Sequence, residues 1–472
     1  MDPKKSPIEH VIVLMLENRS YDHMLGYLPN GHGLTGKEFN LVDPSNPESE
    51  KVLVSDKSGY VTAVNPAHDV VSIERQEYGE VGHIVDPAPM NGFVQVHIET
   101  AKGDVEEGKK IMQCFDPAKI PALTTLAQEF VLCDHWHSSV PGPTWLNRFF
   151  AHAATSDGIS SDDPKHIYKM KTLFDILFVN GKTWNVYYGD IPQSIILQHG
   201  GDALGHFKKF HRYYEDLEDG KLADYTFIEP RFLDFHNWKA TDQHPPHDVR
   251  LGEYLIAEVY DTLRASRYWK KSLLVILYDE HGGFYDHVSP PDHVANPDGK
   301  MATNPPFDFT RLGIRVPAIL ISPWVGKGLI DSTIYEHASI PATVRTLFGL
   351  PEALTARDKA AATFEKNLSQ SAPRTDTPLR LPVPGEPAEI RRHRRFLHST
   401  ELEERFWALI NPKPKSKVPL TLYQQSLMGL TDWINEQSSP GSASLAGKIA
   451  HEHDAARHVQ KSLLRYMKGK KR

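Results

Sequence analysis

The chain has 472 residues, of which 40% are hydrophobic and 24% are charged. This composition is typical of a globular protein with a sizeable core, and the length favours one large domain with an appendage. The formal net charge of −7 gives no overall basicity, so we expect no nucleic acid as a partner. Two cysteines in a chain this long exclude a disulfide framework and imply no oxidising compartment.

The apolar run Val11–Leu16 near the N-terminus is too short for the core of a signal peptide, and an acidic residue follows it. No stretch of the sequence approaches the roughly 18 apolar residues that a membrane-spanning helix needs. We therefore expect a cytoplasmic protein, or one that associates with a membrane peripherally.

Short apolar runs predict buried strands of a parallel sheet. These runs are Val11–Leu16, Trp184–Tyr188, Leu273–Tyr278 and Val316–Ile321. Apolar residues that recur at spacings of three and four predict helices at Lys171–Val179, Leu251–Ser266 and Ala338–Phe348. The mixture of strands and helices along the chain favours an α/β layer fold.

Composition divides the chain into three parts. We expect residues 1–368 to form the catalytic domain, in which Asn30–Asn65 is rich in Gly, Asn, Pro and Ser and predicts loops and short hairpins. Residues 369–390 carry several prolines and predict a linker. Residues 391–472 are predicted to be a mostly helical C-terminal extension.

Acidic residues come directly after two of the predicted strands. Glu17 and Asn18 follow the first strand, and Asp279 and Glu280 follow a later one. In open α/β sheets, ligands gather beyond the carboxyl ends of the strands. Two adjacent acids are costly to bring together unless a cation neutralises them, so this pattern indicates a cation site. The alternatives are a loop in which Glu17 pairs with Arg19, and a charged surface loop.

Thr144 follows the rigid turn Pro141-Gly142-Pro143, and helical spacing continues from it through Ala154. A residue at a helix N-terminus lies beside unpaired N–H groups that favour anions. Its hydroxyl can cap the helix or act as a nucleophile toward phosphorus. The sequence leaves both alternatives open.

Four histidines are candidates for a catalytic role: His68, His244, His247 and His337. The chain has 25 histidines, so any single one is more often a surface or core residue than a catalytic one. His244 stands out because it lies in a proline-constrained loop with acidic neighbours.

Four motifs together resemble the phosphoesterase family that contains bacterial phosphatidylcholine-cleaving phospholipases C, plant non-specific phospholipases C and related bacterial acid phosphatases. The matching segments are Glu17–His23, Pro141–Arg148, Asp279–His287 and Tyr335–Leu350. They occur in the family's order and cover roughly residues 8–350. Tyr21 replaces a Phe of the first motif, and Trp145-Leu146 replace the His-Pro that often follows the threonine.

The resemblance implies an alkaline-phosphatase-like three-layer α/β/α sandwich with a mostly parallel central sheet and the C-terminal helical extension. It assigns a divalent metal ion to Glu17, Asn18, Thr144, Asp279 and Glu280. It also makes Thr144 the nucleophile, with His68 and His244 bonding to the phosphate and the leaving group. Oxygen ligands suit Ca²⁺, Mg²⁺ or Mn²⁺, and Zn²⁺ with histidine is a further alternative.

The function implied by the resemblance is that of a phospholipase C, which cleaves glycerophospholipids to diacylglycerol and a phosphorylated head group through a phosphothreonine intermediate. One alternative is an acid phosphatase that acts on small phosphomonoesters. Another is a phospholipid-binding protein without activity, against which the intact Thr144 and the four metal-ligand residues argue.

The tail helix presents Val459, Leu463 and Met467 on one face, with basic residues around them. A basic amphipathic helix binds anionic lipid surfaces, so peripheral membrane contact through this tail is one expectation. The other is that the apolar face packs on the catalytic domain.

Overall fold

The computed structural model describes residues 6–162, 168–197, 203–235, 238–385, 419–438, 444–445 and 447–469. The end of the predicted linker and the first part of the predicted extension lie outside this range. At the centre of the described residues is an eight-stranded sheet with the order β12-β4-β11-β8-β1-β7-β5-β6. Its strands are β1 His10–Leu16, β4 Val131–Cys133, β5 Trp184–Tyr188, β6 Phe207–Lys209, β7 Tyr225–Glu229, β8 Ser272–Tyr278, β11 Ala318–Ile321 and β12 Leu329–Asp331.

The predicted strands are present, but one of them runs in the other direction. The sheet is parallel throughout except at β11, which pairs antiparallel with both β8 and β4. The prediction that Val316–Ile321 belongs to a parallel strand is therefore wrong in direction. A parallel neighbour needs a crossover connection, usually through a helix. The long segment from β8 to β11 contains no helix and returns the chain at the same edge of the sheet.

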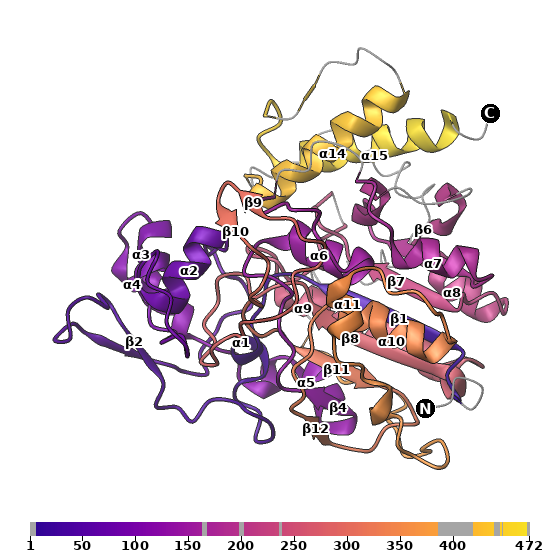
Figure 1. The fold of residues 1–472 in the computed structure, drawn as a ribbon, viewed down its shortest axis with the longest axis horizontal. Helices are drawn as coiled ribbons and strands as arrows, with labels where there is room; N and C mark the ends of the chain where they lie inside the picture. Colours follow the sequence, from indigo (N-terminus) through magenta and orange to yellow (C-terminus); the bar gives the residue numbers. More distant parts are fainter. Residues whose placement is uncertain are drawn as a thin grey trace.

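Helices cover both faces of the sheet (Figure 1), which confirms the three-layer α/β/α architecture. On one face, α9 Val249–Ala265 contacts α5 Pro121–Glu129 and α8 His211–Glu218. On the other, α6 Thr144–Ala153 and α11 Ala356–Ala360 contact α10 Ser339–Phe348, and α7 Leu173–Val179 contacts α6. Strands β1 and β8 lie between the two layers and are completely buried apart from His10.

Residues 39–112 form a separate lobe beside the sheet, at the left of Figure 1. Its hairpin of β2 Phe39–Leu41 and β3 Lys51–Leu53 confirms the predicted loops and hairpins. The sequence analysis did not predict its helices, α2 Val70–Tyr78, α3 Phe93–Thr100 and α4 Val105–Lys109. The lobe has an apolar cluster of its own that includes Ile73 and Phe93.

The remaining elements are short. They are α1 Tyr21–Leu25, the hairpin of β9 Ala302–Thr303 and β10 Pro306–Phe307, and 3-10 helices at Lys110–Met112, Pro117–Lys119, Gln193–Ile196, Ala203–His206, Trp269–Lys271 and Glu365–Asn367.

The described part of the Pro-rich segment follows α9. The hydroxyls of Tyr254 and Tyr260 donate to the carbonyls of Pro384 and Pro378, each at 2.7 Å, and Leu381 is buried. Beyond it, α14 Leu422–Ser438 and α15 Glu452–Gly469 pack against each other, at the top of Figure 1.

The apolar face of the tail helix is buried in this arrangement. Val459 and Leu463 are in the core, whereas Arg457, Lys461 and Arg465 are exposed on the outer face of α15. The Met467 side chain lies outside the described residues. Across the described chain, every helix falls short of the length or the apolarity that crossing a bilayer requires. Membrane contact by the tail stays a prediction, and the exposed basic residues are the part of the helix available for it.

Candidate active site

The first two acidic motifs meet because their strands are neighbours. β1 and β8 pair parallel with Leu16 opposite Tyr278, so Glu17 and Asp279 leave the sheet side by side at its carboxyl edge. The Asn18 N–H donates to Asp279 Oδ1 at 2.9 Å. Asn18 has a φ of 55°, a left-handed conformation that asparagine tolerates better than most residues. This backbone turn keeps both motifs at the same point of the edge.

Thr144 lies against these residues from the first position of α6. Its Oγ1 is 3.4 Å from Glu17 Oε2 and 3.4 Å from Asn18 Oδ1. The N-cap residue of α6 is Pro143, and the cap makes no side-chain hydrogen bond. The sequence left open whether this hydroxyl caps the helix or acts as a nucleophile. In the structure it points at the acidic cluster and does not cap the helix.

Arg148 lies one helical turn after Thr144 and is a part of the site that the sequence analysis did not single out. Its Nη2 is 2.6 Å from Glu17 Oε1, and its Nε is 3.4 Å from Asp279 Oδ2. The guanidinium is fully buried and also lies over the ring of Phe232. The only signal in the sequence was its place in the Pro-Gly-Pro-Thr motif. Here it supplies one positive charge to a cluster of three carboxylates.

One positive charge is not enough for this cluster. Burial raises the pKa of Glu17 well above its usual range, and the charge of Asp279 raises it further. Burial also raises the pKa of Asp279, and it raises the pKa of Glu280 to about 8. In the described structure Glu280 Oε1 has no hydrogen-bond partner, and Glu17 Oε1 and Asp279 Oδ2 have only their ion pairs with Arg148. Buried carboxylates with unpartnered oxygens fit a divalent cation, which would restore their ionised form.

His68 and His244 both lie beside this cluster. His68 Nδ1 donates to the Pro66 carbonyl at 2.7 Å, so its Nε2 accepts from the Asn18 amide at 3.2 Å. That bond turns the amide oxygen of Asn18 toward Thr144. His244 Nδ1 donates to the Pro245 carbonyl, and its buried Nε2 has no partner. The two rings are 6.1 Å apart. Burial lowers the pKa of His244 well below its usual value.

His337 has a structural position. Its Nε2 donates to the main-chain carbonyl of Asp279 at 2.5 Å, and its Nδ1 accepts from Trp136 at 3.3 Å. Both ring nitrogens are used, and burial lowers the pKa of the ring to about 4. His337 therefore helps to fix the main chain at Asp279 through this hydrogen bond.

The C-terminal ends of the Glu17–His23 and Asp279–His287 motifs meet at a second cluster of charged side chains. Asp22, Asp286 and His287 come within metal-ligand distance of one another. Arg315 is fully buried between the acids, with Nη2 3.0 Å from Asp22 and Nε 2.9 Å from Asp286. His287 Nδ1 lies 2.6 Å from Asp22. The guanidinium and His287 together offset the charges of the two acids, so this group is a structural tie between the motifs.

The C-terminal extension reaches the site. The ring of Tyr423, on α14, stacks 6.2 Å from that of His244. Burial, and then the charge of Glu17, raises the pKa of its hydroxyl well above the usual value. Trp145, next to the nucleophile candidate, donates from Nε1 to Ser426 at 2.6 Å. No motif marked residues 369–472, so sequence reasoning missed these contacts.

A third group joins the extension to the loop before α9. Asp234, His247 and Glu452 come within metal-ligand distance of one another. His247 lies 2.6 Å from Asp242 and 3.0 Å from Glu452. The two carboxylates raise the pKa of His247 well above its usual value, against the effect of burial. Burial raises the pKa of Asp242 to about 6, and His247 opposes that rise.

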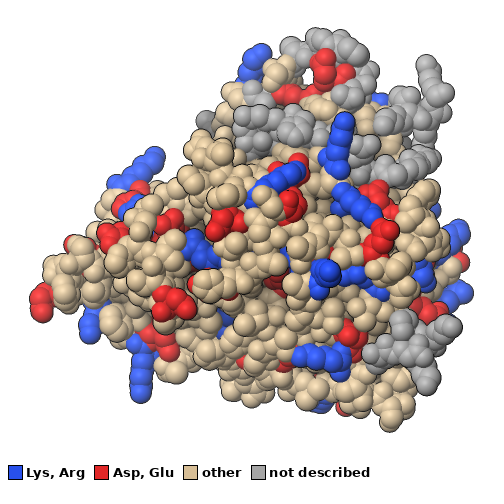
Figure 2. All heavy atoms as spheres, viewed as in Figure 1, with Lys and Arg blue, Asp and Glu red and all other residues tan. Residues whose placement is uncertain are grey.

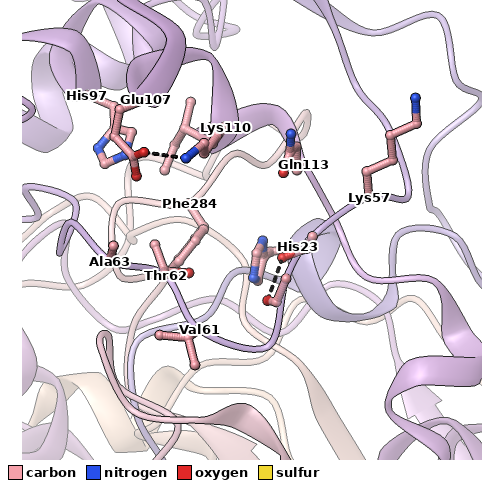
Figure 3. A pocket seen from close by; sticks show the side chains of 13 residues that line it. His23, Lys57, Val61, Thr62, Ala63, His97, Glu107, Lys110, Gln113 and Phe284 are labelled. Atoms are coloured by element: carbon pink, nitrogen blue, oxygen red, sulfur yellow. Dashed lines mark hydrogen bonds and ion pairs between the residues drawn. The ribbon is translucent and has the colours of Figure 1, made fainter. Parts of the chain in front are cut away.

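The cluster is closed to solvent in this structure. Thr144 and the four predicted metal ligands are 0% exposed, His244 is 1% exposed and His68 is 9% exposed. A cavity of about 300 Å³ lies between the N-terminal lobe and the first motif, with His23, His97, Lys57, Lys110 and Phe284 in its wall (Figure 3). None of the predicted site residues lines it. On the face of the molecule in Figure 2, acidic and basic side chains are interspersed.

Comparison with known proteins identifies the family. The family model described as Phosphoesterase family matches residues 8–351. The chain belongs to this family. This result confirms the family that the four motifs indicated. The similar proteins described next are named as phospholipases C.

Two relatives show the range of similarity. Non-specific phospholipase C1 from Arabidopsis thaliana is 43% identical over 401 residues, which are 80% of this chain and 74% of the relative. Phospholipase C A from Mycobacterium tuberculosis is 26% identical over 400 residues, which are 73% of each chain. Among solved structures, a protein of the alkaline phosphatase superfamily from Vibrio parahaemolyticus matches 64% of this chain and 83% of its own, with 12% identity and a TM-score of 0.34.

Arg315→Ala tests the tie between the motifs. Removing one partner of a buried charge network leaves Asp22 and Asp286 uncompensated, so we expect a loss of about 3–5 kcal/mol in the free energy of unfolding. Arg212→Ala, which removes the exposed pair with Glu215, should cost about 1 kcal/mol or less. Urea denaturation followed by circular dichroism measures both. Equal, small losses would show that Arg315 is not the tie.

Metal affinity should rise with pH. The pKa of Glu280 is about 8 in the absence of a metal ion, and a carboxylate must lose its proton to bind one. We expect the apparent affinity for Mn²⁺ or Ca²⁺ to increase by at least about tenfold per pH unit up to about pH 8, because the raised pKa values of Glu17 and Asp279 add to that of Glu280. Calorimetric titration of chelator-treated protein at pH 6, 7 and 8 measures this, and an affinity that is flat over this range would contradict it.

The proton on Glu280 also determines how the free energy of unfolding of the metal-free protein changes with pH. Between pH 4.5 and about 8 the metal-free native state keeps a proton on Glu280 that the unfolded chain has released. This group therefore lowers the stability of the metal-free protein as pH rises through that window. Glu280→Gln should remove both metal binding and this contribution. Glu77→Gln is the matched control and should leave metal binding unchanged. Glu77 is also buried, with a pKa of about 7, but it lies outside the cluster.

Proposed function

We propose that this protein is a phospholipase C that cleaves glycerophospholipids to diacylglycerol and a phosphorylated head group, with Thr144 as nucleophile. The observation that carries the proposal is the Thr144 hydroxyl, which lies 3.4 Å from both Glu17 and Asn18 at an uncapped helix N-terminus. The names of the relatives, phospholipases C from a plant and a bacterium, support phospholipid as the substrate.

The residues Glu17, Asn18, Asp279 and Glu280, together with Thr144, would hold the divalent ion. When bound there, the ion would polarise the phosphoryl oxygens and favour the ionised form of the Thr144 hydroxyl. All five ligands bind through oxygen, which favours Ca²⁺, Mg²⁺ or Mn²⁺ over Zn²⁺. Arg148 remains beside the same carboxylates and would share in neutralising the phosphate.

In the first step, Thr144 Oγ1 attacks phosphorus in line with the diacylglycerol oxygen. The Thr144 proton passes toward Glu17, the carboxylate to which the hydroxyl is directed. The bond from phosphorus to the diacylglycerol oxygen breaks, and His244 protonates that oxygen from Nε2. A bound phosphodiester anion beside the ring would raise the pKa of His244, which opposes the lowering by burial.

In the second step, water attacks the phosphothreonine from the opposite side, and His244 takes the proton of that water. Thr144 leaves with its proton restored, and the phosphorylated head group is released. His68 lies beside the same cluster, and its protonated ring would donate from Nε2 to the phosphate in place of the bond with the Asn18 amide. Division of one displacement into two is the usual gain from a covalent nucleophile.

Thr144→Ala tests the nucleophile. We expect turnover to fall by at least about a thousandfold, because the covalent step is lost. Metal content and thermal stability should change little, since the remaining ligands and the helix are intact. Thr144→Ser keeps the hydroxyl and should keep measurable activity. Near-normal turnover in Thr144→Ala would contradict the assignment.

Hydrolysis of two substrates separates the proposal from its alternatives. We expect phosphatidylcholine in vesicles to be cleaved faster than a soluble phosphomonoester, and chelator to abolish cleavage of both. A preference for the monoester would favour an acid phosphatase. Vesicle binding without hydrolysis, in metal-loaded protein, would favour a phospholipid-binding protein without activity.

A further inference from the structure

The C-terminal extension contributes a buried carboxylate to the region around the active site. Glu452 is the first residue of α15 and is 1% exposed. Its Oε1 lies 3.0 Å from His247 Nε2 and accepts from Gln424 Nε2 at 3.1 Å. The N–H of Asp234 donates to the same oxygen. A side chain near the end of the chain is thus built into the catalytic domain.

His247 connects this carboxylate to a second one. Its Nδ1 lies 2.6 Å from Asp242 Oδ1, on the side of the ring opposite Glu452. An imidazole that bridges two carboxylates donates from both nitrogens only when it is protonated. The ring therefore carries a positive charge between two acids, and each acid stabilises it.

Asp242 in turn determines the positions of two active-site residues. Its Oδ1 accepts the N–H of His244 at 3.1 Å. Its main-chain carbonyl accepts the N–H of Glu17 at 2.9 Å. The Asp242 side chain is fully buried, so the hydrogen bond to His247 is a main constraint on where it lies. A shift of Asp242 would move the ring of His244 relative to Thr144.

We propose that Glu452 is a positioning residue for the reaction: through His247 and Asp242 it fixes the loop that carries His244, and so the C-terminal extension completes the active site. This inference rests on the proposed role of His244 as the acid for the leaving group. Glu452 itself touches no reacting atom. Asp234, His247 and Glu452 lie within metal-ligand distance of one another, and these hydrogen bonds explain that proximity without a bound ion.

Glu452→Gln changes this chain of contacts with little change in volume. A neutral amide cannot stabilise the charged ring of His247, so the ring loses its positive charge and with it the ion pair that joins it to α15. The loop that carries His244 is then less well fixed. A displacement of about 1 Å in a catalytic group can cost about a hundredfold in rate.

The test compares two soluble phosphocholine esters that differ in their leaving group. One is a short-chain phosphatidylcholine used as monomers, whose alkoxide leaving group needs a proton. The other is p-nitrophenyl phosphocholine, whose phenolate leaves without one. Metal-loaded, full-length wild type, Glu452→Gln, His244→Ala and Asp454→Asn are assayed on both. Asp454 is the matched control, because it is an exposed acid two residues further along α15.

We expect Glu452→Gln to lower kcat on the phosphatidylcholine by at least about tenfold, and on the chromogenic ester by about threefold or less, with KM little changed. His244→Ala should show the same preference more strongly, and Asp454→Asn should match wild type on both esters. The ratio of the two rates does not depend on the folded fraction, so it reports position even if the variant is less stable.

The outcomes distinguish the inference from the function on which it rests. An equal loss on both esters, or no loss, in Glu452→Gln would show that Glu452 only fastens the extension, and would overturn the inference. If His244→Ala shows the preference and Glu452→Gln does not, the role of His244 stands and the inference falls alone. If His244→Ala slows both esters equally, the proposed role of His244 and the inference fall together.

Discussion

Three carboxylates buried side by side at the ends of β1 and β8 are the constraint on which the rest of the site depends. Glu17, Asp279 and Glu280 are shielded from water, and each raises the free energy of ionising the others. Such a cluster survives in a folded protein only where positive charge and rigid backbone surround it. Arg148 provides one such charge, and a divalent ion would provide the rest.

Several charged side chains of the motifs keep that cluster in place through contacts with neighbouring loops. Arg19 donates from Nε and Nη2 to the carbonyl of Gln243, and its guanidinium lies 4.5 Å from the ring of Phe284. It thereby joins the first motif to the loop of His244 and to the Asp279–His287 motif. Arg315 joins the far ends of the same two motifs. Two buried arginines thus fix three loops at the carboxyl edge of the sheet.

The sequence predicted the fold class and the meeting of the two acidic motifs, because a short apolar strand followed by an acid is a local pattern. It did not predict β7 Tyr225–Glu229, which contains the polar residues Thr226 and Glu229 although all of its residues are buried. It also gave β11 the wrong direction, since strand direction depends on the connection and not on the strand. Tyr423 and Glu452 were unpredictable for another reason: their place in the site comes from tertiary packing of a segment without a motif.

The central place of β1 has a consequence for how the chain is made. Val11 pairs with Tyr225 on one side and with Leu273 on the other. Both neighbouring strands of β1 are therefore synthesised long after β1 itself. At usual translation rates of about 5–20 residues per second, this delay is on the order of tens of seconds. During it, an apolar strand with two open edges emerges from the ribosome without a partner, which is a known hazard for aggregation. The protein should therefore depend on chaperones that bind nascent chains more than its final stability alone would indicate.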